Sequence, residues 1–123
     1  MIVGIGIDIV DNRRIRDLYQ RYGDAFIKKI LHENEMGNIK EGNIIERLSG
    51  TFATKEAVIK ALSHIHDKDI MPSDIIVFHN EHGSPFVKLD SRREPIGEGL
   101  SIHISISHEV EYSVAMAVIE RND

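Results

Sequence analysis

Two carboxylates and a lysine in this sequence could together hold a cation and a phosphate. Glu56 and Lys60 stand four residues apart in the segment LSGTFATKEAVIKAL (48–62), and Asp8 stands near the end of an apolar amino-terminal segment. Mg²⁺ is commonly held by one or two carboxylates, with substrate phosphates and water completing its octahedron. A lysine one helical turn from such a carboxylate would suit a phosphate oxygen. Asp8 and Glu56 are therefore candidate metal ligands, and Lys60 is a candidate phosphate contact.

Each of these residues also has an ordinary structural explanation. Glu56 and Lys60 could be a surface pair at i and i+4, which is common and worth about 0.3–0.5 kcal/mol. Spacing alone favours that explanation. Asp8 is unusual inside a strand and could instead cap the helix that follows. Lys55 falls among apolar helix positions, where a buried stem with a solvent-reaching amine is the simple interpretation.

Several other patterns in the sequence either exclude a particular kind of site or support one only weakly. Gly4 and Gly6 suggest a dinucleotide fingerprint, but the third glycine is replaced by Ile9 and the pair lies inside the predicted strand. Strand glycines more often mark a bend or a close approach by another backbone. The seven histidines show no HxxxH or HExxH spacing, so a zinc site has little support. Ser107 and His108 point to opposite faces of a predicted strand and cannot form a triad, although His108 ends that strand at a tight turn suited to ligand contact.

The composition predicts one soluble globular domain over residues 1–123. The chain has 41% hydrophobic and 28% charged residues, which is ordinary for that class. No apolar run approaches the roughly 20 residues that span a membrane, and MIVGIGIDIV has no basic flank of a signal peptide. Because the chain has no cysteine, disulfides and thiolate chemistry are excluded, and a cytoplasmic location is expected.

The charge distribution is uneven. The net charge is −5, which argues against non-specific nucleic-acid binding. Six bases and two acids lie between Asn12 and Lys29, a local charge of +4 that leaves −9 for the remainder. Such a basic segment on an acidic body suits an acidic partner. Charge alone favours the simpler explanation of a solvated helix face.

Hydrophobic periodicity predicts the elements that must position these side chains. The predicted helices are Arg13–Tyr22, Ala25–Leu31 and a long helix of roughly Asn43–Ile65. The predicted strands are Ile2–Val10, Asp74–His79, Pro85–Leu89, Leu100–His108 and Tyr112–Glu120. A strand, then helices, then a run of strands predicts an α+β fold with a mostly antiparallel sheet.

Details of the helices are also predicted. Asp11-Asn12 should cap the first helix, Asp24 should cap the second, and 32–43 should form a loop or weak helix. On a helical wheel the long helix has one broad apolar arc, with Lys55 inside it and Glu56 at its edge. The members of that arc are Ile44, Ile45, Leu48, Phe52, Val58, Ile59 and Leu62.

Taken together, these segments resemble one family in order and spacing. The matching segments are GIGIDIV at 4–10, FATKEAVIKAL at 52–62, HGSP at 82–85, and SISH at 105–108 followed by EYSVAMAVIE. The chain resembles the holo-[acyl-carrier-protein] synthases, of the 4′-phosphopantetheinyl transferase family, along its whole length. Only 31–45 match poorly. The resemblance implies the α+β fold of that family, with the sheet packed against one long helix and shorter amino-terminal helices.

The resemblance also implies an activity and a site. Such enzymes transfer 4′-phosphopantetheine from coenzyme A to a serine of apo-acyl-carrier protein, release adenosine 3′,5′-bisphosphate and support fatty acid biosynthesis. It implies that Asp8 and Glu56 bind Mg²⁺ and that Lys60 contacts the phosphates, these three being the catalytic residues. The serine proton would go to Glu56 or to a metal-bound water. The implied coenzyme A contacts are Lys55, Lys60, Gly83, Pro85, Ser107 and His108.

The same resemblance implies partners. Acyl-carrier proteins are acidic, so the basic segment would bind one, and the implied contacts are Arg13, Arg14 and Arg21. A homotrimer with active sites between subunits is expected. Many family members carry a basic residue at the position of Thr51. In this chain the corresponding phosphate contact on coenzyme A is either missing or supplied by Arg47 or Lys40.

Two other functions fit parts of the pattern. A non-catalytic module that binds coenzyme A or a carrier protein is the main alternative, and intact Asp8, Glu56 and Lys60 speak against it. A Mg²⁺-dependent nucleotide hydrolase would use the same acids, but the chain lacks a glycine-rich phosphate cradle.

Overall fold

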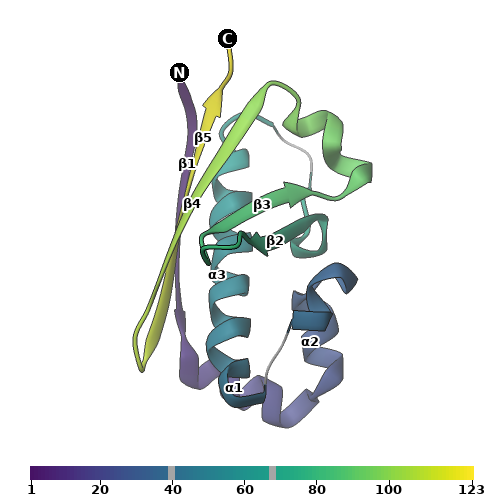
Figure 1. Ribbon diagram of the computed structural model, residues 1–123, viewed down its shortest axis with the longest axis vertical. Helices are drawn as coiled ribbons and strands as arrows, with labels where there is room; N and C mark the ends of the chain where they lie inside the picture. Colours follow the sequence, from purple (N-terminus) through teal and green to yellow (C-terminus); the bar gives the residue numbers. More distant parts are fainter. Residues whose placement is uncertain (39–40, 67–68) are drawn as a thin grey trace.

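A long helix, α3 (Ile44–Leu62), forms the centre of the molecule in the computed structural model, which describes residues 1–38, 41–66 and 69–123 (Figure 1). On one side of α3 lies a three-stranded antiparallel sheet in the order β1–β5–β4. Its strands are β1 (Ile2–Asp11), β4 (Leu100–His108) and β5 (Tyr112–Arg121). On the other side lie α2 (Asp24–Ile30) and an antiparallel hairpin of β2 (Ile75–His79) and β3 (Pro85–Leu89).

The remaining elements connect these layers. They are α1 (Asn12–Tyr22) and the 3₁₀ helices η1 (Glu33–Asn38), η2 (Glu41–Asn43), η3 (Pro72–Asp74) and η4 (Ser91–Gly97). The predicted α+β class is confirmed. The strands form two separate sheets, however, because β3 and β4, which η4 connects, are not hydrogen-bonded to each other (Figure 1).

The helix ends follow local side-chain chemistry. Asp11 caps α1 as predicted, since its Oδ1 accepts a hydrogen bond from the Arg13 amide at 2.9 Å. The predicted cap at Asp24 is wrong. Gly23 occupies the cap position with φ of 54°. Asp24 is the first residue of α2, where its negative charge interacts favourably with the positive end of the helix dipole. Segment 32–43 forms η1 and η2 where it is described.

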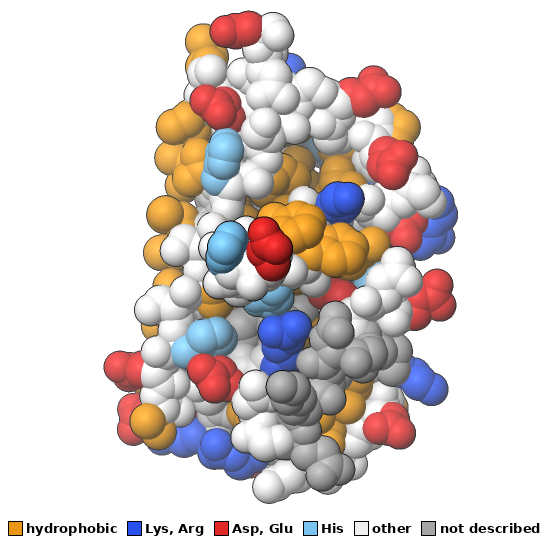
Figure 2. Space-filling model, in the orientation of Figure 1, with side chains coloured by type: hydrophobic (Ala, Val, Ile, Leu, Met, Phe, Trp, Pro, Cys, Tyr) orange, Lys and Arg blue, Asp and Glu red, His pale blue; other side chains and the backbone are white. Residues whose placement is uncertain are grey.

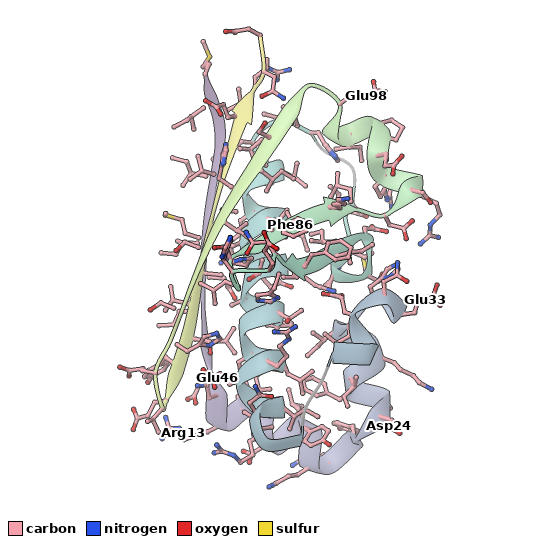
Figure 3. The ribbon with its side chains drawn as sticks, in the orientation of Figure 1. Arg13, Asp24, Glu33, Glu46, Phe86 and Glu98 are labelled. Atoms are coloured by element: carbon pink, nitrogen blue, oxygen red, sulfur yellow. The ribbon has the colours of Figure 1, made fainter. Side chains whose placement is uncertain are left out.

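Alternating side chains divide the three-stranded sheet into two faces. Gly4, Gly6 and Asp8 of β1 face α3, while Ile5 and Ile7 point the other way and are 56% and 60% exposed. Figure 3 shows side chains of this sheet projecting away from α3. One face of the sheet is therefore core, and the other exposes apolar side chains along β1.

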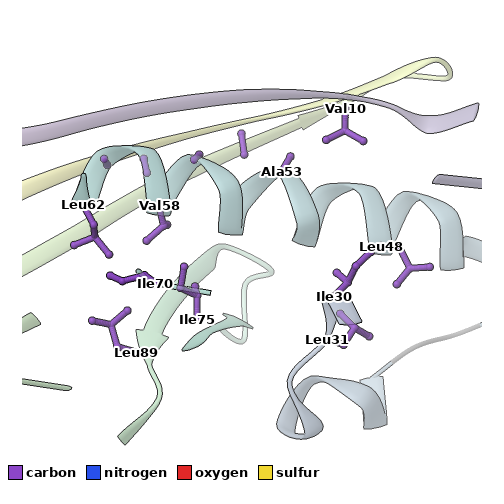
Figure 4. Packing of buried hydrophobic residues seen from close by; sticks show 14 of the residues in the cluster. Val10, Ile30, Leu31, Leu48, Ala53, Val58, Leu62, Ile70, Ile75 and Leu89 are labelled. Carbon is purple, nitrogen blue, oxygen red and sulfur yellow. The ribbon is translucent and has the colours of Figure 1, made fainter. Parts of the chain in front are cut away.

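Nearly the whole circumference of α3 is buried. Small residues, Ala53, Ala57 and Ala61, are fully buried along with Leu48, Val58 and Leu62. Figure 4 shows Ala53 on the side of α3 toward the sheet, with Val58 and Leu62 toward the hairpin. The predicted apolar arc holds for Leu48, Val58 and Leu62, but its other members are only partly buried. A hydrophobic wheel misses the second buried face because alanine carries little of that signal.

The two strand glycines allow the close contact between β1 and α3. A Cβ added at Gly4 would collide with the Ala61 carbonyl, and one added at Gly6 with the Ala57 carbonyl. The predicted close backbone approach is confirmed. Because both obstacles are helix backbone, a side chain at either position would force the strand away from the helix.

We expect Gly6→Ala to destabilise the protein by about 1–3 kcal/mol or more, the usual cost of overpacking. Urea unfolding followed by circular dichroism measures the change. Gly42→Ala is the matched control, because a Cβ there meets nothing within 4 Å. Equal unfolding midpoints for the two variants would contradict the close packing.

Lys55 lies in the core and its amine does not reach solvent, so that prediction is wrong. The residue is 0% exposed, and burial lowers the pKa of its ammonium. Its Nζ donates to the Ile30 carbonyl at 2.7 Å and to Glu35 Oε1 at 2.5 Å. The other Glu35 oxygen accepts from the Val77 amide at 3.0 Å. Lys55 thus joins α3 to α2, η1 and β2, and we remove it from the candidate coenzyme A contacts.

Candidate functional site

An acidic cavity lies where β1 passes α3. Asp8 faces the helix because it shares the inner face of β1 with the two glycines. Lys60 Nζ donates to Asp8 Oδ1 at 3.0 Å and to the Ile7 carbonyl at 3.0 Å. The cavity, of about 560 Å³, is lined by Asp8 and Glu56 with apolar residues that include Phe52. The structure therefore brings the three predicted catalytic residues together.

The electrostatics of this cavity distinguish Glu56. Burial, and secondly the negative charge of Asp8, raise the pKa of Glu56, and Lys60 partly offsets this. Residues 1–38, 41–66 and 69–123 contain no cluster of three or more acidic, histidine or cysteine side chains that could hold a metal. A pair of carboxylates suits Mg²⁺, which takes its remaining ligands from water and substrate phosphates. The residues present fit that cation.

A titration tests this arrangement. We expect the pKa of Glu56, followed by carboxyl ¹³C NMR, to lie above its ordinary value of 4.5. Asp8→Asn should lower it without restoring the ordinary value, because burial remains. Because the pKa of Glu56 is higher in the folded chain than its ordinary 4.5, the free energy of unfolding should fall as pH rises from 4.5 through the folded pKa. Mg²⁺ affinity should rise over the same interval, because the cation binds the charged carboxylate. Asp17→Asn, at an exposed α1 position, is the control; an equal shift there would contradict the pairing with Asp8.

A second cavity, of about 500 Å³, lies at the junction of α1, the start of α3 and the β4–β5 turn. It is lined by His108 together with Asn12, Arg16, Asn43, Glu46 and others. The His108 ring lies on α3 at Gly50, where an added Cβ would be 2.5 Å from the ring Cε1. A glycine at this position of the helix therefore makes room for the imidazole.

Basic groups gather beside His108. Burial, followed by the positive charges of Arg47 and His108, lowers the pKa of His79. His79 ends β2 and pairs across the hairpin with Pro85. The sequence does not distinguish His79 from the other histidines, because only the packing of the hairpin on α3 brings it near the other two bases. No spacing in the sequence signals it.

The turn of that hairpin is closed at Gly83. Gly83 has φ of 85° and its amide donates to the Asn80 carbonyl at 2.9 Å. Gly83 and Pro85 thus shape the turn that carries His79, and their contact with coenzyme A remains a prediction.

The acidic cavity and the His108 cavity are separate within one chain. Asp8 and Glu56 line the first, and His108 lines the second. Ser107 lies on the outer face of the sheet, because it neighbours His108 on a strand. One chain therefore does not bring Ser107 and His108 to the carboxylates.

The basic residues of α1 face different surroundings. Arg13 forms an ion pair with Asp11 at 3.0 Å, which offsets part of its charge. Arg14 lines the acidic cavity and Arg16 the His108 cavity. Arg21 lies in the last turn of α1. Their predicted contact with a carrier protein remains a prediction.

The position of Thr51 lies in the core. Thr51 is 5% exposed, so a long basic side chain would have to reach out from a buried site. Arg47, one turn earlier and half-buried, lies close enough to His79 to lower its pKa. Lys40 lies outside the described residues.

Comparison with known proteins identifies the family. Residues 4–117 match the model of the 4′-phosphopantetheinyl transferase superfamily. The chain belongs to this superfamily. A relative from Thermodesulfovibrio yellowstonii, a holo-[acyl-carrier-protein] synthase, is 41% identical over 120 residues, which cover 97% of this chain and 99% of the relative.

Solved structures of the superfamily share the fold. A holo-(acyl-carrier-protein) synthase from Bacillus anthracis, in complex with CoA (3′,5′-ADP), aligns with a TM-score of 0.82 at 35% identity and 99% coverage of both chains. The holo-[acyl-carrier-protein] synthase of Neisseria meningitidis aligns with a TM-score of 0.89 at 30% identity, over 98% of this chain and 100% of that one. In the part of this transferase that the structure describes, no helix is long and apolar enough to cross a membrane.

Proposed function

We propose that this chain transfers 4′-phosphopantetheine from coenzyme A to a serine hydroxyl of apo-acyl-carrier protein, with Mg²⁺. The observation that supports this most strongly is that Asp8 and Glu56 line one cavity, with Lys60 hydrogen-bonded to Asp8, in a phosphopantetheinyl transferase chain. We further place the reaction in the cytoplasm and in the supply of holo-carrier protein for fatty acid biosynthesis.

The chemistry assigns each residue a task. The serine oxygen attacks the phosphorus that carries pantetheine, the bond to the other phosphate breaks, and adenosine 3′,5′-bisphosphate leaves. Asp8 and Glu56 would hold Mg²⁺, which supplies positive charge at the pyrophosphate when bound. Lys60 would donate to a phosphate oxygen and offset the charge that grows on the leaving group. The raised pKa of Glu56 suits it to accept the serine proton, directly or through water.

We also propose that the protein assembles as a homotrimer with active sites between subunits. Support comes from the outer face of the sheet, where neighbouring apolar side chains are exposed: Ile5 56%, Ile7 60%, Ile9 63% and Met116 44%. Ile7 pairs directly with Met116 across the strands, so these side chains form one patch. Orange hydrophobic atoms follow this edge of the molecule in Figure 2.

The separate cavities support the same assembly. Within one chain, His108 and the two carboxylates line different cavities. A neighbouring subunit on the apolar face could bring its own His108 and Ser107 to the acidic cavity. Coenzyme A would then lie between subunits, with its phosphates between Lys60 of one and His108 of the other.

Helix α1 is proposed to bind the carrier protein. One of its exposed bases, Arg14, lines the acidic cavity. An acidic partner would be steered to this helix by charge complementarity. Arg13, Arg14 and Arg21 are the proposed contacts.

Mass spectrometry of the carrier protein tests the proposed function. Incubation with apo-carrier protein, coenzyme A and Mg²⁺ should add one phosphopantetheine to the carrier, and chelation of the cation should prevent it. An unchanged carrier mass with intact coenzyme A would indicate a binding module. Hydrolysed coenzyme A with an unchanged carrier would indicate a hydrolase.

A further inference from the structure

A buried chain of hydrogen bonds ends on the ring of His108. Ser113 of β5 lies directly across the strands from His108 and is 0% exposed. Its Oγ lies 3.0 Å from His108 Nδ1 and donates to Asn12 Oδ1 at 2.9 Å. Asn12, the first residue of α1, is 4% exposed. No sequence pattern connects Asn12 with this pair, because it lies 101 residues from Ser113 along the chain.

The orientation of the Asn12 amide is set by the β4–β5 turn. Its Nδ2 donates to the carbonyls of Glu109 and Val110, at 3.0 and 3.2 Å. A flipped amide would aim its oxygen at these two carbonyl oxygens and lose both bonds. The Asn12 backbone amide also donates to the Glu111 carbonyl at 2.8 Å. Asn12 therefore holds the whole turn and presents its oxygen to Ser113.

This orientation determines where each proton lies. Because Asn12 Oδ1 can only accept, the Ser113 hydroxyl must donate its single proton to it. The Ser113 oxygen is then left as an acceptor for His108, so the proton of that bond belongs to Nδ1. Nε2 is the nitrogen left for a ligand. It accepts a hydrogen bond when the ring is neutral and donates one when the ring is charged.

We propose that Asn12 and Ser113 are positioning residues that fix the tautomer and orientation of His108, so that its Nε2 faces the ligand. This rests on the proposed function, in which His108 contacts the phosphate end of coenzyme A. The ring is held on two sides, by Ser113 and by the surface of α3 at Gly50. Figure 3 shows the surrounding elements, with Arg13 at the start of α1 and Glu46 at the start of α3.

NMR of the intact protein tests the tautomer without any turnover. Long-range ¹H–¹⁵N spectra, recorded where the ring is neutral and assigned with His108→Gln, should show the His108 proton on Nδ1. Ser113→Ala should move a measurable share of it to Nε2, and Ser113→Thr should restore the Nδ1 form. Ser101→Ala is the matched control, because Ser101 Oγ donates to Asn122 Oδ1 at 2.9 Å in the same sheet. A proton on Nε2 in the unmodified protein, or no change in Ser113→Ala, overturns the proposal.

Kinetics separate positioning from general stability. Ser113→Ala should raise KM for coenzyme A about tenfold, the scale of one lost hydrogen bond to a charged group, with little change in kcat. If Ser113→Ala folds poorly, Asn12→Asp is the second variant. Its side chain cannot donate to the turn carbonyls, and it should also raise KM for coenzyme A. A changed tautomer with an unchanged KM overturns the positioning role. Absence of transfer in the unmodified protein overturns the proposed function instead, and the tautomer result stands apart from it.

Discussion

Glu56→Gln should lower the rate of phosphopantetheine transfer by at least about 100-fold, the scale of losing one preorganised electrostatic group. The amide keeps the size of the side chain but cannot carry the charge that binds Mg²⁺ or accept the serine proton. The rate is measured by carrier-protein mass at saturating coenzyme A and Mg²⁺.

The fold of this variant should remain intact. Burial and Asp8 raise the pKa of Glu56, so the charged side chain is destabilising and the neutral amide should give an equal or higher unfolding temperature. Glu94→Gln, an exposed change on η4, should retain full activity. Full activity in Glu56→Gln would remove this residue from the proposed metal site.

Ile5→Glu should separate the assembly into single chains and reduce transfer by more than about 100-fold. The substitution places a charge on the exposed apolar face of β1, and burying it without a partner in each interface would cost several kcal/mol. Light scattering after size-exclusion chromatography measures the mass. The unmodified protein should have three times the chain mass of 13.9 kDa, and the variant one times that mass.

Met71→Glu provides a matched control. Met71 is 57% exposed, close to the 56% of Ile5, but lies away from the sheet. It should keep both assembly and activity. A fully active unmodified protein with the mass of a single chain would contradict the assembly.

The sequence predicts much of this fold because the signals are local. The alternation of polar and apolar residues along 101–108, and the helix-breaking residues Gly23 and Pro72, place the elements to within a few residues. Glu56 and Lys60 share one helix, and Asp8 reaches them because Gly4 and Gly6 let β1 approach α3.

Other features depend on contacts that no local pattern carries. Lys55 is buried because Glu35, on another element, supplies a charge partner. His79 joins Arg47 and His108 only through packing of the hairpin. Nor does any periodicity indicate that the strands divide into two sheets, since that depends on whether β3 and β4 pair with each other.

Subunit mixing tests the central claim, a transferase site divided between subunits. Glu56→Gln and His108→Ala chains, each impaired alone, are exchanged in equal amounts and assayed by mass gain of the carrier protein. Random mixing in a cyclic trimer should restore activity to about one quarter of the unmodified level, because that share of interfaces pairs an intact Glu56 with an intact His108. A mixture of Glu56→Gln with Asp8→Asn should restore none, since both changes affect the same side of the interface. Activity no greater than the average of the separate variants would contradict a divided site.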